Sequence, residues 1–230
     1  MGARGYFIAG TDTGVGKTRV SCALLQAFRA SGKRAAGMKP VATGAMRRHG
    51  GLISDDVERI TLNSAQITAR SVLNPYIFEP PVSPDIAAEM VGICIEIDVI
   101  VAKYRQIAAE TGLVLVEGTG GWLCPIGTET TMADVAVALG LPIVLVVGLR
   151  LGCINHALLT AESIRSRGCA LAGWIGNRVD PDYLLPEANL ATLTRMLGAA
   201  PLALLDYQPV VASDPPPELL ELARRLQPES

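Results

Sequence analysis

The stretch GTDTGVGKT, residues 10–18, follows the apolar run YFIA at residues 6–9 and precedes an apolar helical pattern. It ends as phosphate-binding loops end, but it is one residue longer than the usual pattern G-x-x-x-x-G-K-[ST]. Counting back from Gly16, that pattern asks for glycine where this chain has Thr11. The order of strand, glycine-rich turn and helix still predicts a loop whose backbone N–H groups and helix N-terminus face phosphate oxygens.

Each part of this loop has an expected role in nucleotide binding. Gly14 and Gly16 supply the tight backbone, Lys17 bridges the β- and γ-phosphates, and Thr18 offers its hydroxyl to Mg²⁺. The nucleotide-binding residues expected here are Thr13, Gly14, Val15, Gly16, Lys17 and Thr18. The alternative is a plain glycine-rich turn that caps a helix, but GVGKT between a strand and a helix is a specific signal.

Strand-like and helix-like segments alternate along the rest of the chain. The strand-like runs are continuously apolar, as in parallel strands that are covered on both faces. They occupy residues 6–10, 35–41, 113–118, 142–148, 170–177 and, more weakly, 201–205. Helical patterns occupy residues 18–32, 54–64, 97–112, 131–140, 154–168 and 187–198. The alternation predicts a single-domain, doubly wound α/β fold with a mostly parallel sheet and helices on both faces.

Three segments depart from the alternation. Residues 42–53 have the composition of a loop, and residues 74–85 contain four prolines, which excludes a helix interior. Residues 214–230 predict a short amphipathic helix and a tail that close a domain spanning residues 1–230.

Composition narrows the classes of function. The 230 residues carry a formal charge of −2, which leaves no basic surplus for a nucleic-acid-binding face. The five cysteines are widely spaced and form no C-x-x-C pair, which favours free thiols in a reducing cytoplasm over disulfides or a zinc site. The longest uncharged apolar stretch, residues 135–149, is interrupted by Gly140 and Pro142 and is short for a membrane span. We therefore expect a cytoplasmic protein that binds neither nucleic acid nor membrane.

Acidic residues beside the phosphate loop are candidate metal ligands. Glu117 ends a buried strand and is followed by Gly118, Thr119 and Gly120, so it is placed like a metal ligand or a water-positioning group. The alternative is a solvated carboxylate at a strand end. Asp55 and Asp56 begin a predicted helix, where either one binds metal or merely caps the helix.

Lys39 is the second candidate for phosphate chemistry. It ends the strand expected next to the phosphate loop, where its ammonium could contact a transferring phosphoryl group or a carboxylate. The alternative is an ordinary strand-end cation. Thr43 and Gly44 follow and suit the close approach of a substrate. The chain has only two histidines, which gives little support to a Ser–His or Cys–His hydrolase.

Six motifs together resemble the dethiobiotin synthetase family, which has a P-loop NTPase fold. They are GTDTGVGKT, MKPVATG, NPYIFEPPVSP, VEGTGGW, LVVGLRLGCINHALLT and LAGWIGN, and the match to the family runs in order from residue 5 to about residue 197. The resemblance implies ATP- and Mg²⁺-dependent carboxylation and ring closure of 7,8-diaminononanoate with CO₂ to dethiobiotin, ADP and phosphate. The reaction would pass through a carbamate and a carbamic–phosphoric anhydride. The phosphoryl transfer that forms the anhydride would rely on positioning and charge stabilisation.

The resemblance also implies roles for individual residues. Lys17 and Lys39 would be catalytic, and Thr43 would contact the diamine or the carbamate. The metal ligands would be Thr18, Asp56 and Glu117, with Asp56 preferred because its spacing from Thr43 matches the family without a gap. Further nucleotide contacts would come from Gly118, Thr119, Gly120, Asn177 and Arg178.

The family resemblance further implies a homodimer whose substrate carboxylate binds across the interface. The loop that receives it would be Gly152, Cys153, Ile154 and Asn155, through backbone N–H groups at a helix start. The alternative for this loop is a plain helix N-cap at Asn155. The chain departs from some family members at Gly14, at Asn189 and in the adenine-side loop 206–209, where they place Glu, Tyr and a different segment.

Two other classes of ATPase have comparable loops. A partition-type switch ATPase places a signature lysine five residues before the phosphate-binding lysine, and this chain has Asp12 there. An ATP-dependent amidoligase of related fold usually adds a glutaminase domain, for which 230 residues leave no room. Turnover that depends on the diamine, rather than on a protein or DNA partner, separates the three.

Overall fold

The computed structural model describes residues 5–48, 50–65, 69–208 and 216–226. Its centre is a six-stranded sheet in the order β10-β9-β8-β1-β7-β2, in which every neighbouring pair is parallel. The strands are β1 (Gly5–Gly10), β2 (Ala35–Met38), β7 (Leu113–Glu117), β8 (Ile143–Leu149), β9 (Leu171–Arg178) and β10 (Ala203–Leu205). Because β1 lies inside the sheet, its carboxyl end is flanked by the ends of β7 and β8.

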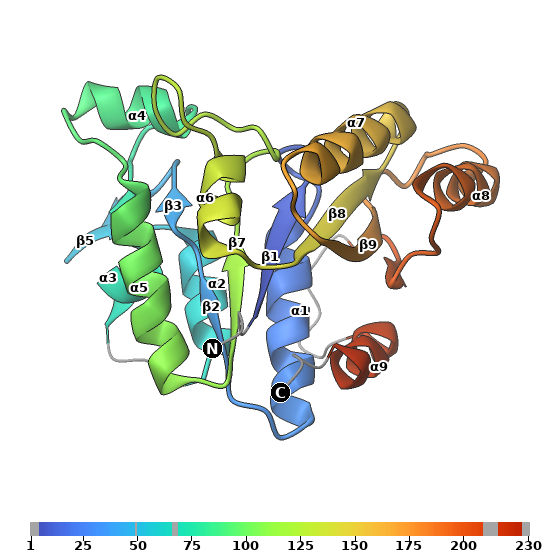
Figure 1. Ribbon diagram of the computed structural model, residues 1–230, viewed down its shortest axis with the longest axis horizontal. Coiled ribbons are helices and arrows are strands. Elements are labelled where there is room, and N and C mark those ends of the chain that lie inside the picture. Colours follow the sequence, from blue (N-terminus) through green and yellow to red (C-terminus); the bar gives the residue numbers. More distant parts are fainter. Residues whose placement is uncertain (1–4, 49, 66–68, 209–215, 227–230) are drawn as a thin grey trace.

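Helices cover both faces of the sheet (Figure 1). One face packs against α1 (Lys17–Ala30), α2 (Asp55–Asn63) and α9 (Pro217–Arg225). The other packs against α3 (Arg70–Leu73), α4 (Pro84–Met90), α5 (Ile97–Glu110), α6 (Met132–Leu139), α7 (Cys153–Ser166) and α8 (Pro186–Leu197). Strands β1, β7 and β8 are buried along their whole length, as continuously apolar central strands require. The predicted doubly wound parallel α/β fold is confirmed.

The segments between β2 and α5 contain more regular structure than the sequence predicts. Residues 42–53 are not simply a loop, because β4 (Met46–Arg48) and β5 (Gly51–Ile53) form an antiparallel hairpin. Val41–Ala42 (β3) pairs with Tyr76–Ile77 (β6), after Lys39 and Pro40 have ended β2. This second small sheet carries the chain past the carboxyl edge of the main sheet and brings residues 42–43 and 81–84 to one cavity.

The C-terminal helix is confirmed as α9, and the tail at residues 227–230 lies outside the described residues. None of the helices in the described ranges has the length and apolarity needed to cross a membrane.

Candidate active site

The phosphate loop connects β1 to α1 at the centre of the sheet edge. Gly14 and Gly16 have φ of 74° and 90°, in the left-handed region that glycine adopts without strain. A Cβ on Gly16 would lie 2.1 Å from Asn177 Nδ2, so glycine is also required there by space. The side chain of Val15 packs into the core against Gly148 of β8, which anchors the loop to the neighbouring strand.

The side chain of Lys17 curls back over the loop from the first turn of α1. Its ammonium donates to the carbonyl of Asp12 at 3.0 Å and to the carbonyl of Gly120. Burial, together with the nearby positive charge of Lys39, lowers the pKa of Lys17 to about 8. The cation is therefore held beside the glycine-rich loops, where it is available to a bound phosphate.

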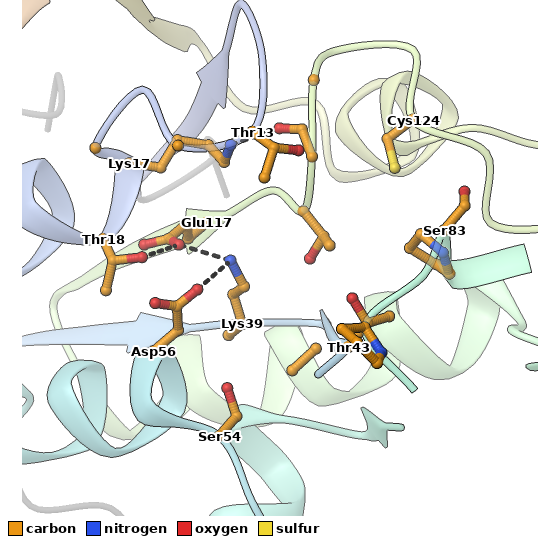
Figure 2. A pocket seen from close by; sticks show the side chains of 18 of the residues that line it. Thr13, Lys17, Thr18, Lys39, Thr43, Ser54, Asp56, Ser83, Glu117 and Cys124 are labelled. Atoms are coloured by element: carbon orange, nitrogen blue, oxygen red, sulfur yellow. Dashed lines mark hydrogen bonds and ion pairs between the residues drawn. The ribbon is translucent and has the colours of Figure 1, made fainter. Parts of the chain in front are cut away.

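An ion cluster lies beneath the phosphate loop, where β2 and β7 end (Figure 2). Lys39 Nζ lies 2.7 Å from Glu117 Oε1 and 3.3 Å from Asp56 Oδ2. The hydroxyl of Thr18 donates to Glu117 Oε1 at 2.8 Å. The side chains of Lys39 and Glu117 are almost completely buried, whereas that of Asp56 is 47% exposed. Four residues from four separate sequence segments therefore form one connected cluster.

The charges in this cluster stabilise one another. Burial alone would lower the pKa of Lys39, but the carboxylates of Glu117 and Asp56 outweigh it and raise that pKa. Burial likewise opposes ionisation of Asp56, yet the charge of Lys39 and a hydrogen bond from Thr18 hold the pKa of Asp56 below its usual value. The neighbouring acid, Asp55, is exposed and lies outside the cavity. The structure thus places Asp56, and not Asp55, beside Lys39.

A cavity of about 840 Å³ opens above the ion cluster. Thr13, Gly14, Gly16 and Gly120 border it on the phosphate side, and Thr43 and Thr119 also face it. Sequence reasoning assigned no role to several other lining residues, namely Arg19, Ser54, Arg59, Pro81, Val82, Ser83, Pro84 and Cys124. Figure 2 shows Ser83 and Cys124 around the same space as Thr43. The run SPD at residues 83–85 is a helix-start signal, and α4 begins there with Ser83 as its cap, but only the fold brings this helix start to the cavity.

Some expected nucleotide contacts lie away from the cavity. Asn177 is buried, and its amide donates to the Val15 carbonyl at 2.9 Å and accepts from Arg19 at 2.7 Å. Arg178 pairs with Glu187 at 2.7 Å on the surface. Gly118 is not part of the lining, although its carbonyl accepts a hydrogen bond from Lys39 at 3.2 Å. Asn177 therefore supports the backbone of the phosphate loop at Val15, on the side away from the cavity.

The loop Gly152–Asn155 is also separate from this cavity. Helix α7 begins at Cys153 with Gly152 as its cap, so the alternative of a helix N-cap at Asn155 is wrong. Cys153 is buried, with its thiol 3.4 Å from the Tyr183 hydroxyl. Asn189 donates to the carbonyls of Leu184 and Leu185 and so serves the start of its own helix.

The cluster has the donors that a Mg²⁺ ion needs. Mg²⁺ is usually held by one or two carboxylates together with substrate phosphates and water. Glu117 Oε2 is buried and has no hydrogen-bond partner among the described residues, which leaves one oxygen free to bind a cation. Asp56 and the Thr18 hydroxyl lie on the same side of the cavity. Thr18, Asp56 and Glu117 therefore fit a Mg²⁺ site that phosphate oxygens complete.

Comparison with known proteins identifies the family. A family model described as an AAA domain matches residues 4–214. The ATP-dependent dethiobiotin synthetase BioD of Nitrosospira multiformis is 44% identical over 221 residues, which are 96% of this chain and 96% of that protein. The protein of the same name from Aromatoleum aromaticum is 46% identical over 212 residues, 92% and 93% of the two chains. The chain belongs to the dethiobiotin synthetase family. The resemblance found in its six motifs is confirmed.

Solved structures show how widely this fold is shared beyond the dethiobiotin synthetases. The MinD cell division protein of Aquifex aeolicus has a TM-score of 0.60 at 17% identity, covering 99% of this chain and 98% of that one. A ParA family ATPase from Chlorobium tepidum has a TM-score of 0.54 at 12% identity, covering 90% and 86%. These similarities concern the fold alone. In this dethiobiotin synthetase family member, Asp12 takes the place of the signature lysine of the switch ATPases and pairs with Arg150 at 2.5 Å.

Proposed function

We propose that this chain uses ATP to carboxylate 7,8-diaminononanoate with CO₂ and to close the ring, releasing dethiobiotin, ADP and phosphate. Family membership supports the reaction. The observation that carries it is the shared cavity: Lys17 and Thr18 of the phosphate loop face the same 840 Å³ space as Lys39 and Thr43. A triphosphate and a small diamino acid can thus meet within one chamber, which makes direct phosphoryl transfer between them possible.

The proposed reaction has three steps. An amine nitrogen of the substrate attacks CO₂ and loses a proton, which forms the N–C bond of a carbamate. A carbamate oxygen then attacks the γ-phosphorus, and the bond to ADP breaks. The second amine attacks the carbamoyl carbon and loses a proton, and phosphate leaves with the oxygen that had attacked. Each ring closure thus consumes one ATP and one CO₂ and leaves a cyclic urea.

The residues of the chain contribute charge and position to these steps. The Lys17 ammonium, held over the phosphate loop, stabilises charge on the transferring phosphoryl group. Lys39 is held at the end of β2 by Glu117 and Asp56 and directs its charge toward the carbamate and γ-phosphate. Thr43 offers a hydroxyl on the opposite wall, where the diamine would lie. The buried ion cluster keeps Lys39 in a fixed place, and the carbonyls of Asp12 and Gly120 do the same for Lys17, before the substrates arrive.

We further propose that Thr18, Asp56 and Glu117 hold Mg²⁺. When bound, the ion would neutralise the negative charge that develops between the β- and γ-phosphates. The buried, unpartnered Glu117 Oε2 supports this assignment. The chain's own part is to hold both carboxylates beside the phosphate loop, where Lys39 contacts each of them.

The active assembly proposed is a cytoplasmic homodimer. The loop Gly152–Asn155 lies outside the cavity, so a second copy of the chain is the simplest source of a carboxylate-binding loop beside it. The free state of all five cysteines agrees with a reducing compartment. Mixing two inactive variants, one altered at Lys39 and one in the 152–155 loop, should restore activity in mixed dimers. Absence of any recovery would place both functions in one subunit.

Oxygen transfer tests the proposed anhydride directly. Turnover with ¹⁸O-labelled CO₂ in ordinary water, over a time shorter than its exchange with water, should place one ¹⁸O in each released phosphate. The label reaches phosphate because the carbamate oxygen that attacks the γ-phosphorus departs with it. Unlabelled phosphate, formed together with labelled cyclic urea, would contradict the anhydride and leave only the overall reaction standing.

A further inference from the structure

Arg150 joins the phosphate loop to the start of α7. Its guanidinium lies 2.5 Å from Asp12 Oδ2, and its own carbonyl accepts the N–H of Cys153 at 3.0 Å. The side chain therefore holds the phosphate loop while the backbone shapes the turn that begins α7. Arg150 lies in the motif LVVGLRLGCINHALLT, directly after the end of β8, and the family resemblance gave it no role.

The two loops are already neighbours because β1 and β8 are adjacent in the sheet (Figure 1). Thr11 N donates to the Val146 carbonyl at 3.1 Å, so the phosphate loop leaves β1 alongside β8. A Cβ on Gly148 would lie 2.9 Å from Val15 Cγ1, which shows how closely the loop rests on the end of that strand. Together with these two contacts, the Asp12–Arg150 ion pair joins the phosphate loop to the segment that leads into α7.

Electrostatics gives the pair a second purpose. Asp12 places a carboxylate in a loop that must receive a polyphosphate, where like charges repel. One carboxylate oxygen accepts the N–H of Thr13 at 2.7 Å, and the other pairs with Arg150. The Asp12 carbonyl also accepts a hydrogen bond from Lys17. A shift of Asp12 would therefore disturb the hydrogen bond that holds the Lys17 ammonium. The positive charge of Arg150 offsets the negative charge that Asp12 places in the loop.

We propose that Arg150 is a positioning residue that fixes the phosphate loop and the Gly152–Asn155 turn in one mutual arrangement through Asp12. Binding of nucleotide phosphates at the loop then orders the first turn of α7, and the two anion-binding segments act together. The inference rests on the proposed function only for the nature of the second ligand, the diamino acid. Its first test needs the nucleotide alone.

That test is amide hydrogen exchange with Mg²⁺ and a non-hydrolysable ATP analogue. In the wild type, the analogue should slow exchange both in the phosphate loop and in residues 151–156. In Arg150→Gln and Asp12→Asn, protection of the phosphate loop should remain and protection of residues 151–156 should be lost. Arg167→Gln, which breaks the ion pair with Asp134 near the other end of α7, should behave as the wild type. Equal protection of residues 151–156 in the wild type and in Arg150→Gln would overturn the proposal.

Kinetics supplies the second test. The pair is half exposed, so its loss should weaken nucleotide affinity about fivefold at most. Lost positioning should lower kcat/KM for the diamine about tenfold or more. The double variant of Asp12 and Arg150 should be no worse than the poorer single variant, and Arg150→Lys should recover part of the loss. Additive losses would refute the coupling. If the wild type formed no cyclic urea, the proposed function would fail, while the exchange result would still decide this inference.

Discussion

Replacing Lys39 by glutamine tests the ion cluster because it removes the only charge that both carboxylates contact among the described residues. Glu117 is 1% exposed and lies 2.7 Å from the ammonium, so it would become an unpaired buried charge. Breaking such a pair costs about 3–5 kcal/mol of unfolding free energy. Asp56, being 47% exposed, adds little to this cost, and we expect the lower end, about 3 kcal/mol. For a chain of this length, that corresponds to a fall in Tm of about 6–12 °C.

The assay for this prediction is thermal and urea unfolding with and without Mg²⁺. Lys39→Gln should keep nucleotide binding but lose turnover, and Mg²⁺ should raise its Tm more than that of the wild type, because the ion meets two uncompensated carboxylates. Adding Glu117→Gln should return much of the lost stability. The matched control is Lys33→Gln, whose half-buried ammonium lies 5.6 Å from the centre of the Phe28 ring and should matter by about 1 kcal/mol or less. A Tm for Lys39→Gln within 2 °C of the wild type would refute the reasoning.

Three further outcomes follow from the site. Because the pKa of Lys17 is about 8 and phosphates favour its charged form, nucleotide binding should take up about half a proton at pH 8 and much less at pH 6.5. Calorimetry in two buffers of different ionisation enthalpy measures this proton uptake, and undiminished uptake in Lys17→Arg would exclude this lysine as its source. Asp56→Asn should abolish Mg²⁺-dependent turnover while Asp55→Asn retains it, and equal losses in steady-state assays would argue against the assignment. Gly16→Ala should lose nucleotide binding because its Cβ meets Asn177, whereas Gly14→Ala has open space around it and should show only a backbone cost of about 1–2 kcal/mol. Titration with a fluorescent ADP analogue compares the two variants, and similar affinities would contradict the steric argument.

The sequence predicted the parts of the fold that depend on local pattern. Strands β1, β7 and β8 are continuously apolar and buried on both faces, so their composition alone identifies them. The hairpin of β4 and β5 was not predicted because its two strands have three residues each, are largely exposed and carry no apolar alternation. Its formation depends on pairing across a turn, which periodicity does not report.

The site was predictable in its charged residues and less so in its walls. Lys17, Lys39 and Glu117 lie at strand ends or in a recognisable motif, and the topology brings such ends together at one edge of the sheet. Helix periodicity also favours Asp56 over Asp55 as the acid that faces the site. Asp56 shares a helix face with the buried Ile60, which lies four residues further along α2. Cys124 could not have been assigned, because only the three-dimensional path of the loop after β7 brings its thiol to the cavity.

The most direct measurement of the central claim is product formation by the purified protein. It should be incubated with 7,8-diaminononanoate, ¹³C-labelled CO₂, ATP and Mg²⁺, and the products followed by NMR and mass spectrometry. We predict ADP, phosphate and dethiobiotin in equal amounts, with ¹³C at the urea carbonyl and no ADP release without the diamine. ATP hydrolysis that proceeds at the same rate without the diamine, with no labelled cyclic urea, would contradict the account.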